Sequence, residues 1–384
     1  MLSRDGCYKR RQRLWQALGT ACDWAVIADP QHLMYFANYY QSPFVFRSND
    51  AGAILLLQAH GTSYLVADNL LEPFTARAYV DEVVAPIWYR GKEAAPHREA
   101  WLVRNALQIL KAHEKSRIAV EFAQVPVGLV LGLRELVGHP DRLLDLDPVI
   151  RPLKRRKDPD ELELLQRSMR AGAAAMRQAM QEVRPGMSEL EVFYLVQRAA
   201  QAALGEQALV YGDFVSGPRC EQIGGPPTAR TLRTGDLVLL DFSTVVYHYR
   251  ADFANTFVCG AKPTTRQRDL FEACREALAA GERVLRAGAV ARDVDRAVRG
   301  TLEAKHLGQH FPHHSGHGIG LGHPEPPYLV PGSDEVLLAG DVVTLEPGLY
   351  IPGVAGMRYE RNYLVTDDGY RLLSHHPIQI EAGA

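Results

Sequence analysis

The sequence predicts two domains, an α/β domain over residues 1–153 and an α+β domain over residues 154–384. The length of 384 residues exceeds what one hydrophobic core usually holds. Helical and strand-like patterns alternate in the first part, whereas pairs of helices precede groups of strands in the second. We place the boundary in the basic run 154–157 and interpret this run as a solvated linker rather than a targeting or polyanion-binding patch.

The first domain begins with a helix and continues as alternating strands and helices. Helical periodicity is found over residues 10–18, 98–112 and 127–137. Four short apolar segments are strand-like: AVIAD (25–29), AILLLQ (53–58), SYLVAD (63–68) and RIAVE (117–121).

The second domain opens with two capped helices. Asp158 and Glu161 form a capping box around Pro159, so a long helix starts here, and Gly186 is expected to stop it. A second capping box at residues 188–191 begins the next helix.

Strands and a further helix pair follow. DLVLLDF (236–242) and YRADFANTFVCG (249–260) predict an antiparallel hairpin. Helices are expected over residues 266–285 and 293–305. The remainder, including VVTLEPGLY (342–350) and RYERNYLVTDDGYRLL (358–373), is typical of strands and turns.

The composition excludes several classes of protein. A hydrophobic content of 47% and a charged content of 23% are those of an ordinary globular chain. The formal net charge of -2 gives no electrostatic reason to expect nucleic acid or an anionic membrane as partner. Five separated cysteines form neither a disulfide framework nor a zinc site, and the charged start lacks the apolar core of a secretion signal. We therefore expect a cytoplasmic protein.

Two aspartates stand where strands disfavour them. Asp241 ends the apolar run LVLLD, and Asp252 lies in the expected partner strand. A hairpin can bring both side chains to one face, where mutual repulsion would raise one pKa. A divalent cation would remove that penalty.

Two glutamates and a histidine extend this set. Glu346 follows the apolar VVTL, Glu360 lies on a strand-like run, and glycines flank His317. One buried carboxylate is more often a salt bridge or a cap, but four with an imidazole form a hard ligand set that suits Mn²⁺, Fe²⁺, Co²⁺ or Zn²⁺. Four carboxylates carry more charge than one cation requires, so we infer a pair of metal ions.

This pattern resembles that of the pita-bread metallopeptidases, which include prolidase, aminopeptidase P and methionine aminopeptidase, with metal-free creatinase as a relative. The resemblance is found in LLDF at Asp241, RADF at Asp252, GHGIG at His317, LEPG at Glu346 and RYE at Glu360, and the spacings of the last three are similar to those of prolidases. It implies a pita-bread α+β catalytic domain. The first domain resembles the creatinase/prolidase N-terminal domain in its α/β pattern and its place in the chain.

The resemblance also implies roles for the metal ligands. Asp252 and Glu360 would bridge two metal ions, with Asp241 held mainly to one of them and His317 with Glu346 to the other. The cations would lower the pKa of a shared water, whose hydroxide attacks, and polarise the scissile carbonyl. Glu346 would also carry a proton to the leaving nitrogen.

Further roles concern residues around the ligands. His313 and His323 would stabilise the developing oxyanion or orient the substrate. His314 is expected at the surface or in packing. Arg358 would either orient the carboxylates or form a plain surface salt bridge.

The sequence departs from the prolidase pattern at three places. Pro324 and Glu325 occupy the positions of a usual His-Glu pair, and His323 comes one position early. Ile223-Gly224 replaces a usual Pro-His pair, and Tyr328 stands near the place of a carboxylate-binding arginine. These departures weaken a strict dipeptidase assignment and leave the metal ligands intact.

The sequence therefore predicts a dinuclear metal-dependent hydrolase that cleaves the Xaa-Pro bond of short peptides, as a dipeptidase or an aminopeptidase. An alternative is the same fold acting on a non-peptide amide or amino-acid derivative. A non-catalytic binding protein is a third reading, against which the five intact ligand positions argue. The resemblance suggests a homodimer.

Overall fold

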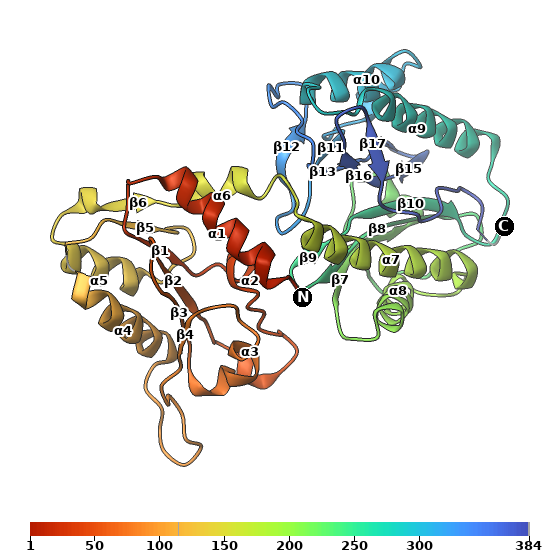
Figure 1. The fold of residues 1–384 in the computed structure, drawn as a ribbon. Coiled ribbons are helices and arrows are strands. Elements are labelled where there is room, and N and C mark those ends of the chain that lie inside the picture. Colours follow the sequence, from red (N-terminus) through yellow and green to blue (C-terminus); the bar gives the residue numbers. More distant parts are fainter. Residues whose placement is uncertain (114, 383–384) are drawn as a thin grey trace. The chain divides into compact units, whose positions relative to one another are not determined.

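The computed structural model describes residues 1–113 and 115–382 (Figure 1). The chain divides into two compact units, Met1–Lys154 and Arg155–Ala384. The sequence placed the boundary after residue 153, and the two units divide between Lys154 and Arg155.

The first unit is built on one six-stranded mixed sheet with the order β4-β3-β2-β1-β5-β6. Its strands are β1 (Trp24–Ile27), β2 (Ile54–Gln58), β3 (Ser63–Val66), β4 (Glu82–Val84), β5 (Ile118–Val120) and β6 (Leu143–Asp145). Its helices are α1 (Arg4–Leu18), α2 (Pro30–Ala37), α3 (Glu72–Thr75), α4 (Arg98–Leu110), α5 (Val127–Val137) and α6 (Asp147–Leu153).

Apolar side chains of α4 and α5 pack with those of β1, β2 and β5 in the core of this unit. The expected strands and longer helices are present. Strands β4 and β6 and helices α2, α3 and α6 were not expected, because a short segment shows too few turns or alternations to give a periodic signal.

The second unit begins with the two helices that capping boxes predicted, α7 (Pro159–Glu182) and α8 (Glu189–Leu204). The expectation that Gly186 stops α7 was wrong, because α7 already ends at Glu182, and Val183 is extended. Pro185 explains the difference, since proline disfavours a helical conformation in the residue before it.

A sheet of order β10-β8-β7 follows these helices, with β9 paired to β8. Its strands are β7 (Leu209–Ser216), β8 (Leu237–Val246), β9 (Tyr249–Arg250) and β10 (Phe253–Val258). Tyr247 and His248, both with positive φ, form a two-residue turn between β8 and β9. The sequence analysis expected the hairpin of β8 and β10, and it did not identify β7.

The last part holds α9 (Thr265–Val284), α10 (Ala291–Glu303) and two further sheets. Five strands have the order β12-β11-β13-β16-β17: β11 (Gly316–Gly318), β12 (Glu325–Leu329), β13 (Val342–Leu345), β16 (Arg361–Val365) and β17 (Tyr370–Leu372). Strands β14 (Gly348–Ile351) and β15 (Ala355–Arg358) form a hairpin. Apolar side chains of α9 and α10 pack with those of the strands in one core. No helix among the described residues is long and apolar enough to cross a bilayer.

Candidate metal centre

Strand pairing places the two aspartates on one face of the β10-β8-β7 sheet in the second unit. Asp241 on β8 lies opposite Ala254 on β10. Asp252 comes just before β10, two residues from Ala254, and side chains two residues apart in an extended segment share a face. The hairpin therefore brings both carboxylates to the wall of the same cavity, as the register in the sequence suggested.

The two glutamates and His317 come from the five-stranded sheet β12-β11-β13-β16-β17. Glu346 directly follows β13 and Glu360 directly precedes β16, at the point where Leu345 pairs with Arg361. His317 lies on β11, the other neighbour of β13. A backbone bond from Glu360 N to Ala254 O, 3.0 Å long, joins this sheet to β10. The two sheets thereby present their acidic side chains to each other.

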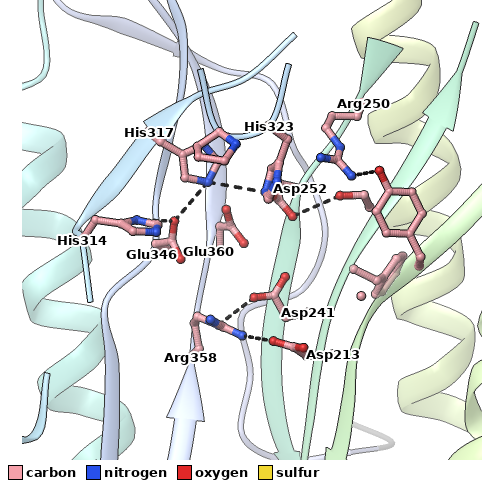
Figure 2. A pocket seen from close by; sticks show the side chains of 15 residues that line it. Asp213, Asp241, Arg250, Asp252, His314, His317, His323, Glu346, Arg358 and Glu360 are labelled. Atoms are coloured by element: carbon pink, nitrogen blue, oxygen red, sulfur yellow. Dashed lines mark hydrogen bonds and ion pairs between the residues drawn. The ribbon is translucent and has the colours of Figure 1, made fainter. Parts of the chain in front are cut away.

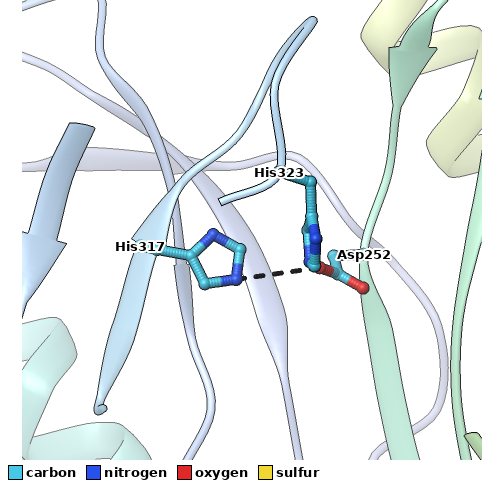
Figure 3. A group of neighbouring side chains, drawn as sticks. All are labelled: Asp252, His317 and His323. Atoms are coloured by element: carbon cyan, nitrogen blue, oxygen red, sulfur yellow. Dashed lines mark ion pairs between the residues drawn. The ribbon is translucent and has the colours of Figure 1, made fainter. Parts of the chain in front are cut away.

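All five predicted ligands line one cavity of about 240 Å³. His317 Nε2 lies 3.4 Å from Glu346 Oε1 and 3.8 Å from Asp252 Oδ2 (Figures 2 and 3). Its Nδ1 lies 2.9 Å from the Gly318 carbonyl oxygen, to which it donates a hydrogen bond. This bond fixes the tautomer and leaves the Nε2 lone pair directed at the carboxylates.

Close approach of the backbone around His317 requires glycine. A Cβ atom on Gly316 would lie 2.1 Å from the Thr344 carbonyl oxygen, and one on Gly318 would lie 2.2 Å from the Pro326 carbonyl oxygen. Glycine at these two positions therefore lets the backbone pack closely around the cluster.

The carboxylates differ in their pKa values. Burial, together with the neighbouring carboxylates, raises the pKa of Glu360 well above its ordinary value. Burial also raises the pKa of Asp241, even with the Arg358 guanidinium beside it. Although burial alone would raise them, the pKa values of Asp252 and Glu346 are lowered, the first by His323 and the second by His314.

The donor set fits divalent cations. Glu360 Oε1 is buried and has no hydrogen-bond partner among the described residues. Donor atoms lie within 4.8 Å of one another in the group of Asp252, His317 and His323 and in the group of His317, Glu346 and Glu360. Oxygen atoms and a neutral imidazole suit Mn²⁺, Fe²⁺, Co²⁺ and Zn²⁺, and such an ion would relieve the repulsion that raises the pKa of Glu360.

The other histidines are placed partly as expected. His323 lines the cavity with Nε2 2.6 Å from Asp252 Oδ2, so its early position in the sequence does not keep it out. His314 has a side chain that is 38% exposed, in keeping with the expected surface position, but it also lines the cavity with Nδ1 3.2 Å from Glu346 Oε1, which was not expected. His313 is not among the described residues that line the cavity, and its Nε2 contacts the Tyr350 hydroxyl at 3.1 Å. Burial lowers the pKa of His313 to about 4.

Arg358 has a buried side chain and forms ion pairs with two aspartates. Its Nε lies 2.6 Å from Asp241 Oδ2, and a terminal nitrogen lies 2.8 Å from Asp213 Oδ2 (Figure 2). The pair with Asp241 is largely buried and is no plain surface salt bridge, whereas the Asp213 side chain is 33% exposed. The sequence analysis did not single out Asp213, which comes from the unpredicted strand β7, directly opposite Asp241.

Asp213 also explains a departure in the sequence. A Cβ atom on Gly224 would lie 1.8 Å from Asp213 Oδ2, so this carboxylate occupies the space that a side chain at position 224 would need. Tyr328, the other departure, is not among the described residues that line the cavity, and its backbone N–H donates to Glu335.

The basic run before α7 is not a solvated linker, in contrast to our expectation. Arg155 pairs with Asp341 at 2.6 Å. Lys157 Nζ lies 2.5 Å from Glu325 Oε1, with side chains only 1% and 6% exposed. Glu325 also accepts a hydrogen bond from Gly322 N, so the Lys157–Glu325 pair fixes the loop that holds His323.

Arg250, Tyr211 and Ser243 complete one side of the cavity. The Arg250 guanidinium lies over the Tyr211 ring, 4.8 Å from its centroid, and donates to the Tyr211 hydroxyl. Ser243 donates to Asp252 Oδ1 at 3.4 Å. None of the three was singled out in the sequence, because only the pairing of β7, β8 and β9 brings them together.

Comparison with known families gives two matches. The profile of metallopeptidase family M24 matches residues 163–367, and that of the creatinase/prolidase N-terminal domain matches residues 10–154. An uncharacterized peptidase of Staphylococcus aureus (strain USA300) is 30% identical over 237 residues, which is 60% of this chain and 66% of that protein. The match thus spans just under two thirds of the relative.

Two solved structures have the same fold over nearly the whole chain. An Xaa-Pro dipeptidase from Bacillus anthracis has a TM-score of 0.82 and 24% identity, covering 98% of this chain and 99% of that one. An X-Pro aminopeptidase from Thermotoga maritima MSB8 has a TM-score of 0.81 and 22% identity, covering 94% and 97%. Together with the family matches, they confirm the predicted fold class, an α/β N-terminal domain followed by a pita-bread domain.

Proposed function

Because the chain belongs to metallopeptidase family M24, we propose that it is a metal-dependent hydrolase that cleaves the Xaa-Pro bond of short peptides. The observation that supports this most is the convergence of four carboxylates and one imidazole on one cavity. A binding protein that only shared the fold would have no need for so many buried acidic groups, which are costly without cations.

Asp241, Asp252, His317, Glu346 and Glu360 would hold two divalent metal ions, with Mn²⁺, Co²⁺, Zn²⁺ and Fe²⁺ as candidates. Bound cations lower the pKa of water and polarise a carbonyl group, which is the chemistry that amide hydrolysis needs. Arg358 would hold Asp241 in place through the 2.6 Å ion pair.

Glu346 has the properties of a proton carrier. The neighbouring histidines lower its pKa, so it is ionised near neutral pH and can accept a proton from the attacking water. Thr344 and His314 contact its Oε1 and hold the carboxylate in position. From there Glu346 would pass the proton to the leaving nitrogen.

His323 and His314 would contact the substrate, since both line the cavity. His323 is held by Asp252 at 2.6 Å, and an imidazole in this position can donate to an oxygen that gains charge in the transition state. We extend the role first expected for His313 and His323 to His314. His313 would contact the substrate only if its hydrogen bond with the Tyr350 hydroxyl were broken.

A second candidate is hydrolysis of a non-peptide amide or amino-acid derivative. The observation that favours it is the Asp213 carboxylate beside Gly224, at the place where prolyl-cleaving relatives have a substrate-contacting histidine. An acidic group there would favour substrates with a different charge or hydrogen-bonding pattern around the scissile bond.

Hydrolysis of Ala-Pro, Ala-Pro-Ala and Ala-Ala by the metal-loaded protein tests the proposal. We expect cleavage of at least one proline-containing peptide, none of Ala-Ala, and no cleavage by Asp252→Asn. Cleavage of the tripeptide alone would mean an aminopeptidase, and of the dipeptide alone a dipeptidase. If none of the three peptides were cleaved although metal was bound, the second candidate would be favoured.

The proposal includes a homodimer in the cytoplasm. The free, buried state of all five cysteines is compatible with a reducing compartment. Light scattering on the purified protein tests the dimer, and a mass of one chain would contradict it.

A further inference from the structure

Arg250 is a buried cation in the wall of the candidate metal centre. Only 7% of the residue is exposed, and it lines the same cavity as Asp252, Glu360 and His317. Its backbone N–H donates to the Gly320 carbonyl oxygen, 3.0 Å away, which anchors this position to the loop between His317 and His323. Figure 2 shows its side chain on the side of the cavity away from His314.

The guanidinium forms no ion pair, and Asp252 and Glu360 are the acidic groups that act on its charge from beyond ion-pair distance. No carboxylate oxygen of the described residues lies within 4.0 Å of it, and its Nε is buried without a hydrogen-bond partner. Its side-chain hydrogen bond goes to the neutral Tyr211 hydroxyl, and the Tyr211 ring supports its face. Tyr211 therefore orients the group without neutralising it.

A buried arginine that lacks a counter-charge is costly, because it keeps its charge at any physiological pH. Proteins usually pair such a group, as this chain does for Arg358 with Asp241 and Asp213. Metal ions held by Asp252 and Glu360 would take up the charge of these two carboxylates, so the guanidinium beside them indicates that a ligand brings a further negative group. Its planar set of donors matches a carboxylate, which it can bind through two hydrogen bonds.

We propose that Arg250 binds the C-terminal carboxylate of the substrate, and thus makes the protein select dipeptides with a free C-terminus. This inference rests on the proposed function and deepens it. Two further observations support it. The cavity of about 240 Å³ is small enough to favour short substrates, and Arg250 is only two residues from Asp252, so a carboxylate bound there lies near the reacting bond.

The kinetic test compares Ala-Pro with its C-terminal amide in wild type, Arg250→Met and Arg250→Lys, with the exposed Arg268→Met as a matched control. Wild type is expected to prefer Ala-Pro. Arg250→Met should lose about 100-fold in kcat/KM for Ala-Pro, mostly through KM, and less than about threefold for the amide. Arg250→Lys should keep part of the preference, because it keeps the charge but not the paired donors.

A binding test separates this inference from the proposed function. Calorimetry on the holoenzyme should show that wild type binds proline at least about tenfold more tightly than prolinamide, and that Arg250→Met binds both equally weakly. This result would support the carboxylate site even if no peptide were cleaved. Equal binding of proline and prolinamide by wild type, or no binding of either, would overturn it.

Two other outcomes also decide the question. Equal loss on Ala-Pro and its amide in Arg250→Met would show a structural role and overturn the proposal. A preference for Glu-Pro amide over Ala-Pro amide that disappears in Arg250→Met would place the carboxylate on a side chain and overturn the C-terminal assignment. Because the removed guanidinium forms no ion pair, Arg250→Met should fold with an unchanged or raised melting temperature in the metal-loaded protein.

Discussion

Two buried arginines lie in the wall of the same cavity and differ in what they contact. Arg358 is held between Asp241 and Asp213 by two ion pairs. Arg250 contacts a tyrosine and has no carboxylate partner among the described residues. Burial alone therefore does not determine what a charged side chain does. Its role depends on whether a neighbouring carboxylate already forms an ion pair with it.

Arg358 thus belongs to the framework of the site. Its guanidinium opposes the rise that burial causes in the pKa of Asp241, and the ion pair holds this carboxylate in place. Arg250 instead forms no ion pair within the protein, and we assign its charge to the binding of the substrate carboxylate.

Arg358→Met should lower the stability of the protein far more than Arg250→Met. It leaves the Asp241 and Asp213 carboxylates without their buried counter-charge, and we expect the metal-free protein to lose about 4 kcal/mol of unfolding free energy. Denaturant titration of wild type, Arg358→Met and Arg250→Met measures this. A similar loss in both variants would contradict the division between the two arginines.

Lys157→Met extends the test to a third buried cation, which is paired like Arg358. Removing it leaves Glu325 buried without its partner, so we expect a loss of about 3 kcal/mol. Lys157→Met/Glu325→Gln should recover much of this loss, because no buried charge remains. The same denaturant titration checks both variants, and no recovery in the double variant would argue against the ion pair as the cause.

Gly224→His tests whether Asp213 occupies the place of the missing histidine. The new Cβ would lie 1.8 Å from Asp213 Oδ2, and the shift it forces should cost about 2 kcal/mol. Asp213→Ala combined with Gly224→His should remove the clash. Thermal unfolding of the single and double variants measures the effect, and an unchanged melting temperature in Gly224→His would show that the space is free.

A buried cysteine thiol can stay neutral, whereas a buried arginine keeps its charge. Burial raises the pKa of Cys259 to about 11 and that of Cys220 to about 12, so the reactive thiolate is scarce at pH 8 and becomes more abundant only as the pH rises toward these values. We expect very slow labelling by a thiol reagent in the native protein at pH 8, and labelling of all five cysteines after denaturation. Rapid native labelling would contradict their burial.

Much of the candidate site could be predicted from the sequence because its residues stand in unusual local contexts. Asp241 at the end of an apolar strand and His317 between glycines attract attention without any structure. The pairing of β8 with β10 follows from their patterns, and it brings Asp241 and Asp252 to one face.

Other parts of the site could not be predicted, because they depend on contacts between distant segments. Asp213 and Tyr211 lie on β7, whose sequence LVYGDFVS has no clear alternation, and they reach the cavity only through pairing with β8. Lys157 looked like part of a solvated run until the structure placed Glu325 beside it. His314, and not the expected His313, lines the cavity. Which of two neighbouring histidines points inward depends on side-chain directions that the order of residues does not reveal.

The central claim is that Asp241, Asp252, His317, Glu346 and Glu360 form a metal centre. The most direct test is equilibrium binding of Mn²⁺ to chelator-treated protein, with Asp252→Asn as the variant and Arg250→Met as the control. We predict two ions per chain for wild type and for Arg250→Met, and at least about 100-fold weaker binding for Asp252→Asn. No binding by wild type, or equal binding by Asp252→Asn, would contradict the claim.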